Sequence, residues 1–217
     1  MDLNLTAHEV LTTTRSVRKR LDFDRPVERA TVLECIDVAL QAPTGSNTQG
    51  WQWMVIEDQA KKQAVADAYA KHFNAYAQQP GREFPAGDIR TERREHVRSS
   101  AQYLADNFHR SPFLVIPLIE GRLDEGLNSF AQASSWGSIL PAVWSFMLAL
   151  RARGLGSAWT TLHLPSEQEV AELLGIPFDR YTQAGLFPVA YTRGTDFKVA
   201  QRLPAAELTH WDTFGEH

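Results

Sequence analysis

The chain has 217 residues, a net charge of -4 and a pI near 6.0, so its charge does not indicate nucleic acid as the main partner. A hydrophobic fraction of 43% with 22% charged residues is typical of a globular protein that buries a sizeable core. The only cysteine, Cys35, excludes an intrachain disulfide and a thiolate metal cluster. We expect a single domain over residues 1–217.

Neither targeting nor membrane insertion is indicated by the sequence. The N-terminus lacks the basic region and apolar core of a secretory signal. The clearest apolar run, FLVIPLI at 113–119, is far shorter than the ~18 residues of a membrane span. We therefore expect a cytoplasmic protein without a membrane partner.

The helical segments are marked by caps and apolar periodicity. Thr6 and Glu9 have the spacing of a capping box, and Gly154 and Gly175 are placed to end later helices. The helix at 129–153 is mostly apolar, so it must be covered on several sides, and we expect Pro141 to interrupt it. Helices are predicted over residues 6–14, 27–42, 58–73, 90–110, 129–153 and, capped by Ser166, 166–175.

Strands are predicted between these helices, at 51–57, 113–119, 157–164 and 184–192. The run at 113–119 is too apolar for a half-exposed strand, so it belongs to a sheet covered on both faces. Strands separated by helices indicate a layered domain around a central sheet. The loop at 78–89 has the Pro/Gly composition of a mobile lid, and the tail at 193–217 has little core of its own, which favours a partner subunit.

Several kinds of chemistry find no support in the sequence. The seven histidines show no ligand pair at helical spacing, so we predict no metal site and interpret His163 as structural. No GxSxG motif is present and Cys35 lies in a predicted helix, so no nucleophile is indicated. The mixed charges of residues 90–98 are interpreted as a solvated helix face.

Three short segments each allow a structural and a functional interpretation. GLGSAW at 154–159 lacks the last glycine of a dinucleotide fingerprint, so it is either a helix cap with a turn or a place where a flat ligand approaches the backbone. Arg15 and Arg18 in TRSVR either complement the end of the first helix or form an anion clamp, for which Arg202 is a further candidate. APTGSNTQGWQW at 42–53 is either a helix-to-strand turn or a binding loop.

Taken together, these segments resemble the FMN-dependent nitroreductase family. TRSVR, APTGSNTQGWQW, RGLGSAWTT, PVAYTRG and QRLPAAELTHWD follow one another as in that family, over most of residues 12–57 and 141–212. The resemblance implies an α+β layered sandwich with a central mixed, mostly antiparallel sheet flanked by helices. It also implies an intertwined homodimer that binds FMN at the subunit interface and uses NAD(P)H to reduce nitroaromatics, quinones or flavins.

The resemblance assigns the cofactor contacts residue by residue. Arg15, Ser16 and Arg202 resemble ligands of the ribityl phosphate, and Arg18 resembles the residue at the pyrimidine edge of the flavin. The backbone at Thr161 and Leu162 corresponds to the segment near flavin N5. In this family a loop from the opposite subunit reaches the flavin ring, and the resemblance implies that Gln49 and the Trp51 region anchor that loop to the sheet. The loop corresponds to Pro43, Thr44, Gly45, Ser46 and Asn47.

The chain departs from the family pattern at several positions. Gly50 stands where a proline is usual, Ser145 where an asparagine is frequent, and Ala200 where a second phosphate cation is common; Lys198 is a candidate substitute for that cation. The flavin would carry the chemistry, so no catalytic side chain is expected. Two alternatives stay open: a related flavoenzyme that dehalogenates or cleaves a flavin, and a flavin-binding sensor or storage protein without turnover.

Overall fold

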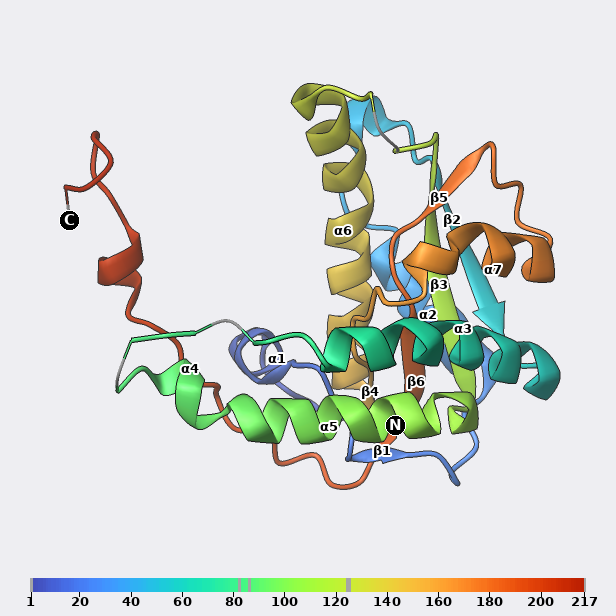
Figure 1. The fold of residues 1–217 in the computed structure, drawn as a ribbon, viewed down its shortest axis with the longest axis horizontal. Helices are drawn as coiled ribbons and strands as arrows, with labels where there is room; N and C mark the ends of the chain where they lie inside the picture. Colours follow the sequence, from blue (N-terminus) through green and yellow to red (C-terminus); the bar gives the residue numbers. More distant parts are fainter. Residues whose placement is uncertain (1, 82, 86, 124–125, 217) are drawn as a thin grey trace.

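The protein is described by a computed structural model that covers residues 2–81, 83–85, 87–123 and 126–216. Its centre is a six-stranded sheet in which all pairings between strands are antiparallel (Figure 1). The main path runs β1 (Leu21–Asp22), β6 (Phe187–Thr192), β3 (Phe113–Glu120) and β2 (Trp51–Ile56), while β4 (Leu155–Gly156) pairs with β6 and β5 (Tyr181–Gln183) pairs with β3.

Strand β3 divides the core into two parts because successive side chains point to opposite faces of a sheet. Leu114 and Ile116 pack into one hydrophobic cluster, whereas Phe113 and Val115 pack into the other. Every residue of β3 except Glu120 is buried. The prediction of a strand covered on both faces is therefore confirmed.

Helices cover each face of the sheet and complete three layers, which confirms the predicted α+β layered fold. On one face α3 (Gln59–Ala77) lies beside α5 (Arg94–Asn107) and α7 (Glu167–Leu174) (Figure 1). On the other face α2 (Arg29–Ala39) packs along α6 (Ser129–Ala152). The shorter helices are α1 (Ala7–Thr13), which contacts α6, and α4 (Ile89–Glu92), which precedes α5.

Two kinds of predicted helix end are confirmed. Thr6 and Glu9 form both bonds of the capping box at the start of α1. Gly154 and Gly175 follow α6 and α7 with φ of 74° and 71°, a left-handed conformation that costs glycine little.

Pro141 does not interrupt α6, contrary to the prediction. The ring is exposed, while its neighbours Ile139, Ala142 and Val143 are completely buried against α2 and the sheet. A proline removes one backbone hydrogen bond from a helix, but packing of the surrounding turns keeps the helix continuous. The predicted helix at 90–110, in contrast, is divided at Arg93, between α4 and α5.

The segment between β4 and α7 also differs from the prediction. Instead of a strand it forms two isolated bridges, Ser157 to Ser16 and Thr160 to Leu186, and then turns into the short 3-10 helix η3 (Leu164–Ser166). Because η3 leads directly into α7, the Ser166 side chain does not cap α7, and its Oγ lies 2.9 Å from His72 Nε2 instead. Strands β1, β4 and β5 were not predicted because two or three residues are too short to show an alternating pattern.

Helix α6 is long and apolar enough to cross a membrane by length and composition alone. The core helices of soluble proteins meet the same criterion, and α6 packs its buried residues on α2 and on the sheet. Other residues of α6, among them Phe130, Pro141 and Trp144, are exposed.

The C-terminal tail extends away from the layered body (Figure 1). It contains one short 3-10 helix, η4 (Ala205–Leu208), and none of the residues from 194 to 216 is buried. Trp211 is 69% exposed and Phe214 is 90% exposed. As predicted, this segment has no core of its own.

Candidate functional site

The two motifs that contain Arg15 and Gly156 lie side by side. Ser16 and Ser157 form a parallel bridge, and Val17 N donates to Ser157 O at 2.8 Å. A Cβ at Gly156 would lie 2.7 Å from Thr192 Cγ2 and 3.0 Å from Val17 Cβ, so only glycine lets the chains approach this closely.

Buried hydrogen-bond donors gather beside this contact. Arg15 Nη2, Arg151 Nη1 and Ser157 Oγ are buried and have no hydrogen-bond partner among the described residues. An unsatisfied buried donor costs about 1–3 kcal/mol, so a ligand that accepts from these groups would be favoured. The charge of the donors favours an anion.

Further positive charges surround the Arg15 guanidinium. Its pKa is lowered, first by burial and then by the charges of Arg202, Arg93 and Arg20. Arg20 and Arg151 lie over the ring of Phe197, at 4.2 and 4.9 Å from its centre. Positive charges that repel one another in this way are stabilised by a bound anion.

The tail brings Arg202 into this positive region. Arg202 is exposed, and its Nη1 donates to Gln201 O at 2.9 Å. Lys198 is also exposed, and its charge contributes to lowering the pKa of Asp196, whose main cause is a hydrogen bond from Arg20. Arg15 and Arg202 are thus near enough to interact, whereas the role of Lys198 stays a prediction.

A pocket of about 530 Å³ brings Arg18, Thr161 and Leu162 together. Burial lowers the pKa of Arg18, and the nearby Tyr69 opposes that effect. Burial also raises the pKa of Tyr69 to about 12, so its phenol stays protonated at neutral pH. The site therefore offers a half-buried cation beside a neutral hydroxyl.

The 42–53 loop lies elsewhere in the subunit. Its short 3-10 helix, η1 (Gly45–Asn47), contacts α6, and Gly45 N donates to Ser138 Oγ at 2.9 Å. Ser138 and Arg151 are separated by roughly 20 Å along α6, from the rise of 1.5 Å per residue. The structure therefore brings Arg15, Ser16, Arg18, Thr161 and Leu162 to one region, and holds the loop residues apart from them within one subunit.

The backbone of the loop is strained. Ser46, Asn47 and Gln49 have φ of 50°, 54° and 50°, a left-handed conformation that is costly for residues other than glycine. Such strain clusters at ligand sites, which motivates a binding role. Pro43 and residues 45–49 are exposed and Thr44 is half-buried.

The expected anchoring of this loop was wrong for Gln49. The Gln49 side chain donates to Asn47 Oδ1 at 3.1 Å, and its backbone N donates to Thr44 Oγ1, so it closes the loop on itself. Attachment to the sheet comes from Trp51, which is buried in β2. Because a short turn satisfies the amide locally, the sequence motif alone did not reveal this pairing.

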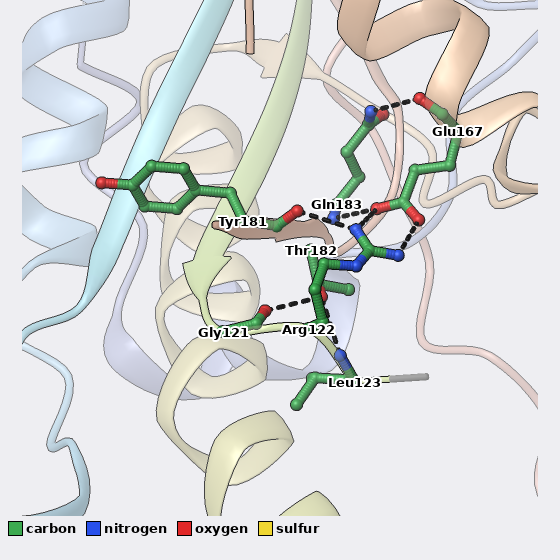
Figure 2. A network of polar contacts seen from close by, with 7 residues as sticks. All are labelled: Gly121, Arg122, Leu123, Glu167, Tyr181, Thr182 and Gln183. Carbon is green, nitrogen blue, oxygen red and sulfur yellow. Dashed lines mark hydrogen bonds and ion pairs between the residues drawn. The ribbon is translucent and has the colours of Figure 1, made fainter. Parts of the chain in front are cut away.

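A partly buried ion pair fixes the segment that follows Leu162 (Figure 2). Arg122 Nη2 donates to Glu167 Oε2 at 2.8 Å and Arg122 Nη1 donates to Tyr181 O at 2.8 Å. Gln183 N donates to Glu167 Oε1 at 2.7 Å, and Gln183 Nε2 donates to Glu167 O at 3.0 Å. The network ties the start of α7 to β5 and thereby holds the preceding turn in place.

His163 lies in the same turn and is completely buried. Burial lowers its pKa to about 4, against the opposing effect of the Gln183 side chain. The ring is therefore neutral at pH 7, and a structural role stays the interpretation. Among the residues that the structure describes, no group of three His, Cys, Asp or Glu side chains could hold a metal ion.

Some residues of this region were not proposed from the sequence. Arg151 lies in the last turn of α6, where a basic residue is usual, and Ser157 belongs to the glycine-rich segment GLGSAW. Tyr69, which lines the pocket, belongs to a helix without a recognisable motif, and Trp159 lies in the GLGSAW segment but was assigned no role of its own. The signals that could have revealed them are a charged residue in an otherwise apolar helix and a serine between glycines and tryptophan.

The fold, an antiparallel sheet between two layers of helices, and the paired motifs point to one protein family. The nitroreductase family model matches residues 11–191, and the chain belongs to that family.

Its relatives have different activities. The chain is 25% identical over 157 residues to a 5,6-dimethylbenzimidazole synthase from Rhodospirillum rubrum, covering 70% of this chain and 67% of the relative. The fold is similar to that of an iodotyrosine deiodinase bound to FMN and 3-iodo-L-tyrosine, with a TM-score of 0.72, 20% identity, and coverage of 96% and 100%. It is also similar to the FMN- and NADPH-dependent nitroreductase NfnB from Sphigopyxis sp. strain HMH, with a TM-score of 0.69, 24% identity, and coverage of 97% and 100%.

Proposed function

We propose that this protein is an FMN-dependent oxidoreductase that takes reducing equivalents from NAD(P)H and passes them to nitroaromatic, quinone or similar acceptors in a ping-pong cycle. The observation that carries the proposal is the set of buried donors without partners, on Arg15, Arg151 and Ser157, in a chain of the nitroreductase family. FMN supplies both a phosphate for those donors and the redox chemistry that the protein's side chains lack.

The residues present fit this cofactor. Arg15, Ser16 and Arg202 would hold the phosphate, with Arg151 and Ser157 supplying further donors. Thr161 and Leu162 would offer backbone N-H groups to the ring within the pocket. Small residues from Pro43 to Asn47 would let the backbone approach a flat ring closely. No side chain is required as a nucleophile.

Arg18 has the electrostatic role in this proposal. It is half-buried, and a cation in a partly water-excluded pocket stabilises negative charge on a reduced ring more than it stabilises the neutral oxidised ring. Arg18→Ala should therefore lower the reduction potential of bound FMN. Redox titration measures this directly, and an unchanged potential with flavin still bound would show that Arg18 is structural.

The proposed functional unit is a homodimer in which α6 packs against a partner. Phe130, Gly137, Pro141 and Trp144 are exposed and follow one another at helical spacing along α6. The tail adds exposed aromatic residues. Among the described strands, β2 pairs with β3 alone and lies at the edge of the sheet. A second copy of the chain would cover these surfaces and bring its 43–49 loop to the Arg15 region.

The similarity to a deiodinase and to a 5,6-dimethylbenzimidazole synthase keeps a related flavoenzyme as a second candidate. The test begins with a visible spectrum of the purified protein, which should show bound flavin. NAD(P)H oxidation is then measured with nitro compounds and with quinones as acceptors. In parallel, dehalogenation is measured with a halogenated tyrosine, and flavin cleavage is measured with reduced FMN and oxygen.

Turnover of nitro compounds or quinones supports the proposal. Dehalogenation or flavin cleavage without that turnover supports the second candidate. A coloured protein that oxidises no NAD(P)H with any acceptor is a sensor or storage protein, and a colourless protein that binds no added FMN contradicts the proposal.

A further inference from the structure

The pocket that contains Arg18 has a second feature, which deepens the proposed function and rests on it. Its walls come from α3, from residues 79–81, from α5 and from the 159–162 segment. The loop predicted as a lid, 78–89, thus contributes Gln79, Pro80 and Gly81; two of its other positions, 82 and 86, lie outside the described residues.

Aromatic side chains form much of the pocket wall. Tyr69, Phe73 and Tyr76 follow one another on α3 at the spacing of one helix face, and Trp159 comes from the segment before Thr161. Aromatic walls favour flat apolar rings, because stacked or tilted rings gain contact beyond the area they bury. The pocket is therefore suited to an aromatic molecule.

The charges of the pocket all have one sign. Arg18, Arg94 and Arg98 line it, and no carboxylate is found among its lining residues that the structure describes. None of these arginines takes part in an ion pair that the described residues form, and Arg98 Nη2 donates only to the backbone at Ala77 O, at 3.2 Å. In a chain with a net charge of -4, this is a local excess of positive charge.

The positions of Arg94 and Arg98 are set by the local structure. They are one turn apart on α5, so both side chains reach the same face of the helix. A Cβ at Gly81 would lie 2.2 Å from Arg94 Nη2, so the absence of a side chain at Gly81 makes room for the Arg94 guanidinium. The mixed-charge segment that the sequence indicated as a solvated face therefore contributes two cations to the pocket.

We propose that this pocket selects aromatic acceptors that carry an anionic group such as a carboxylate. The ring would lie among Tyr69, Tyr76 and Trp159, and the anion would be bound by Arg94 and Arg98. Arg18 is assigned to the flavin, so these two arginines remain for a second anion. Guanidinium groups bind carboxylates with paired, charge-assisted hydrogen bonds, which is consistent with about tenfold selectivity over a neutral analogue.

The test compares 4-nitrobenzoate with the neutral 4-nitrobenzamide. Their dissociation constants for the oxidised holoenzyme are measured by isothermal titration calorimetry, which does not depend on turnover. The variant is Arg94→Gln/Arg98→Gln, and the control is Arg110→Gln, which removes an exposed arginine that pairs with Asp24 outside the pocket. The double variant should bind nitrobenzoate about tenfold more weakly and nitrobenzamide within about twofold of wild type.

The same anion chemistry could come from the phosphates of NAD(P)H, so a second arm separates the two sources. Photoreduced enzyme, which contains no nicotinamide, is mixed with each nitro compound, and flavin reoxidation is followed by stopped flow. Loss of the preference for nitrobenzoate in the double variant supports the proposal. Unchanged preference, with weaker binding of NADPH alone, overturns it.

The failures are also distinguishable. If the protein binds no FMN, the proposed function fails, and calorimetry with the flavin-free chain still reports whether Arg94 and Arg98 bind nitrobenzoate. If the double variant weakens both nitro compounds equally, or neither, the charge selectivity is wrong while the flavin function stands.

Discussion

The two ends of α6 carry contrasting structures. At the C-terminal end, Arg151, Arg15 and Ser157 are packed within the subunit, but some of their buried donors have no described partner. Near the N-terminal end, the 43–49 loop is mostly exposed, and its strained backbone is bonded mainly to itself. One region is mostly buried and has donors without a described partner, and the other has polar groups but is mostly exposed. In the proposed dimer, each region would supply half of one site, with the two halves joined across the subunit interface.

The largest expected effect tests how firmly the packed region is held. Glu167→Gln removes the negative charge that accepts hydrogen bonds from Arg122 and from Gln183 N in a partly buried network, so the free energy of unfolding should fall by about 3 kcal/mol. The control is Glu169→Gln on the same helix, where the pair with Lys71 is exposed and the loss should stay below about 1 kcal/mol. Urea denaturation measures both, and equal losses would show that the network does not hold the turn.

A second prediction concerns acid and the same turn. Burial lowers the pKa of His163 in the folded protein to about 4, from an ordinary value of 6.5, so between these pH values the unfolded chain binds a proton that the folded chain does not. Unfolding free energy should therefore fall as pH falls from about 6.5 to 4, by roughly 3 kcal/mol from this residue.

His163→Gln removes this contribution, so its unfolding free energy should fall less than that of wild type over the same range. The measurement is urea denaturation of both proteins at pH 7 and pH 4.5. Comparing the two proteins cancels the contribution of the carboxylates that they share. An equal fall in unfolding free energy in the two proteins would mean that protonation of His163 does not destabilise the folded state.

The third prediction joins the packed region to the tail. Arg202 is exposed, so Arg202→Ala should leave the stability of the flavin-free protein unchanged and weaken FMN binding about tenfold, through loss of one charge-assisted bond. Arg180→Ala, which removes an exposed arginine paired with Glu120, should leave FMN affinity as in wild type. Fluorescence titration of FMN provides the measurement, and equal affinity of all three proteins would remove Arg202 from the site.

The smallest effect tests strain in the exposed loop. Ser46 has φ of 50°, so Ser46→Gly should raise the free energy of unfolding by about 0.5–1 kcal/mol. Thr48, two residues later, has φ of -70°, so Thr48→Gly should lower it by a similar amount. If both glycine variants are destabilised, strain in the loop is not a feature of the free subunit.

The sequence predicted the layered fold well where its signals were local. The caps at Thr6 and Gly175 and the apolar run of β3 depend on neighbouring residues, and the structure confirms them. Pro141 was misjudged because the continuity of α6 depends on packing from distant segments. Strand β5 was missed because its pairing with β3 depends on distant residues.

The candidate site was predicted unevenly for the same reason. Arg15, Arg18 and Thr161 were identified from motifs, and the structure brings their segments together. Arg94 and Arg98 were assigned to solvent because helical charge patterning does not show what lies opposite. The Arg122 and Glu167 pair joins residues 45 positions apart, and no sequence pattern predicts such a contact.

The most direct test of the composite site counts flavin in mixed dimers. One chain carries Arg15→Ala and Arg202→Ala, the other carries Gly45→Trp, and differently tagged chains are co-expressed so that the mixed dimer can be purified. If the loop crosses to the partner, one site receives both defects and the other receives none, so the mixed dimer should contain one FMN and recover turnover, while each parent dimer contains none. A mixed dimer without FMN would show that the loop serves its own subunit, contradicting the account.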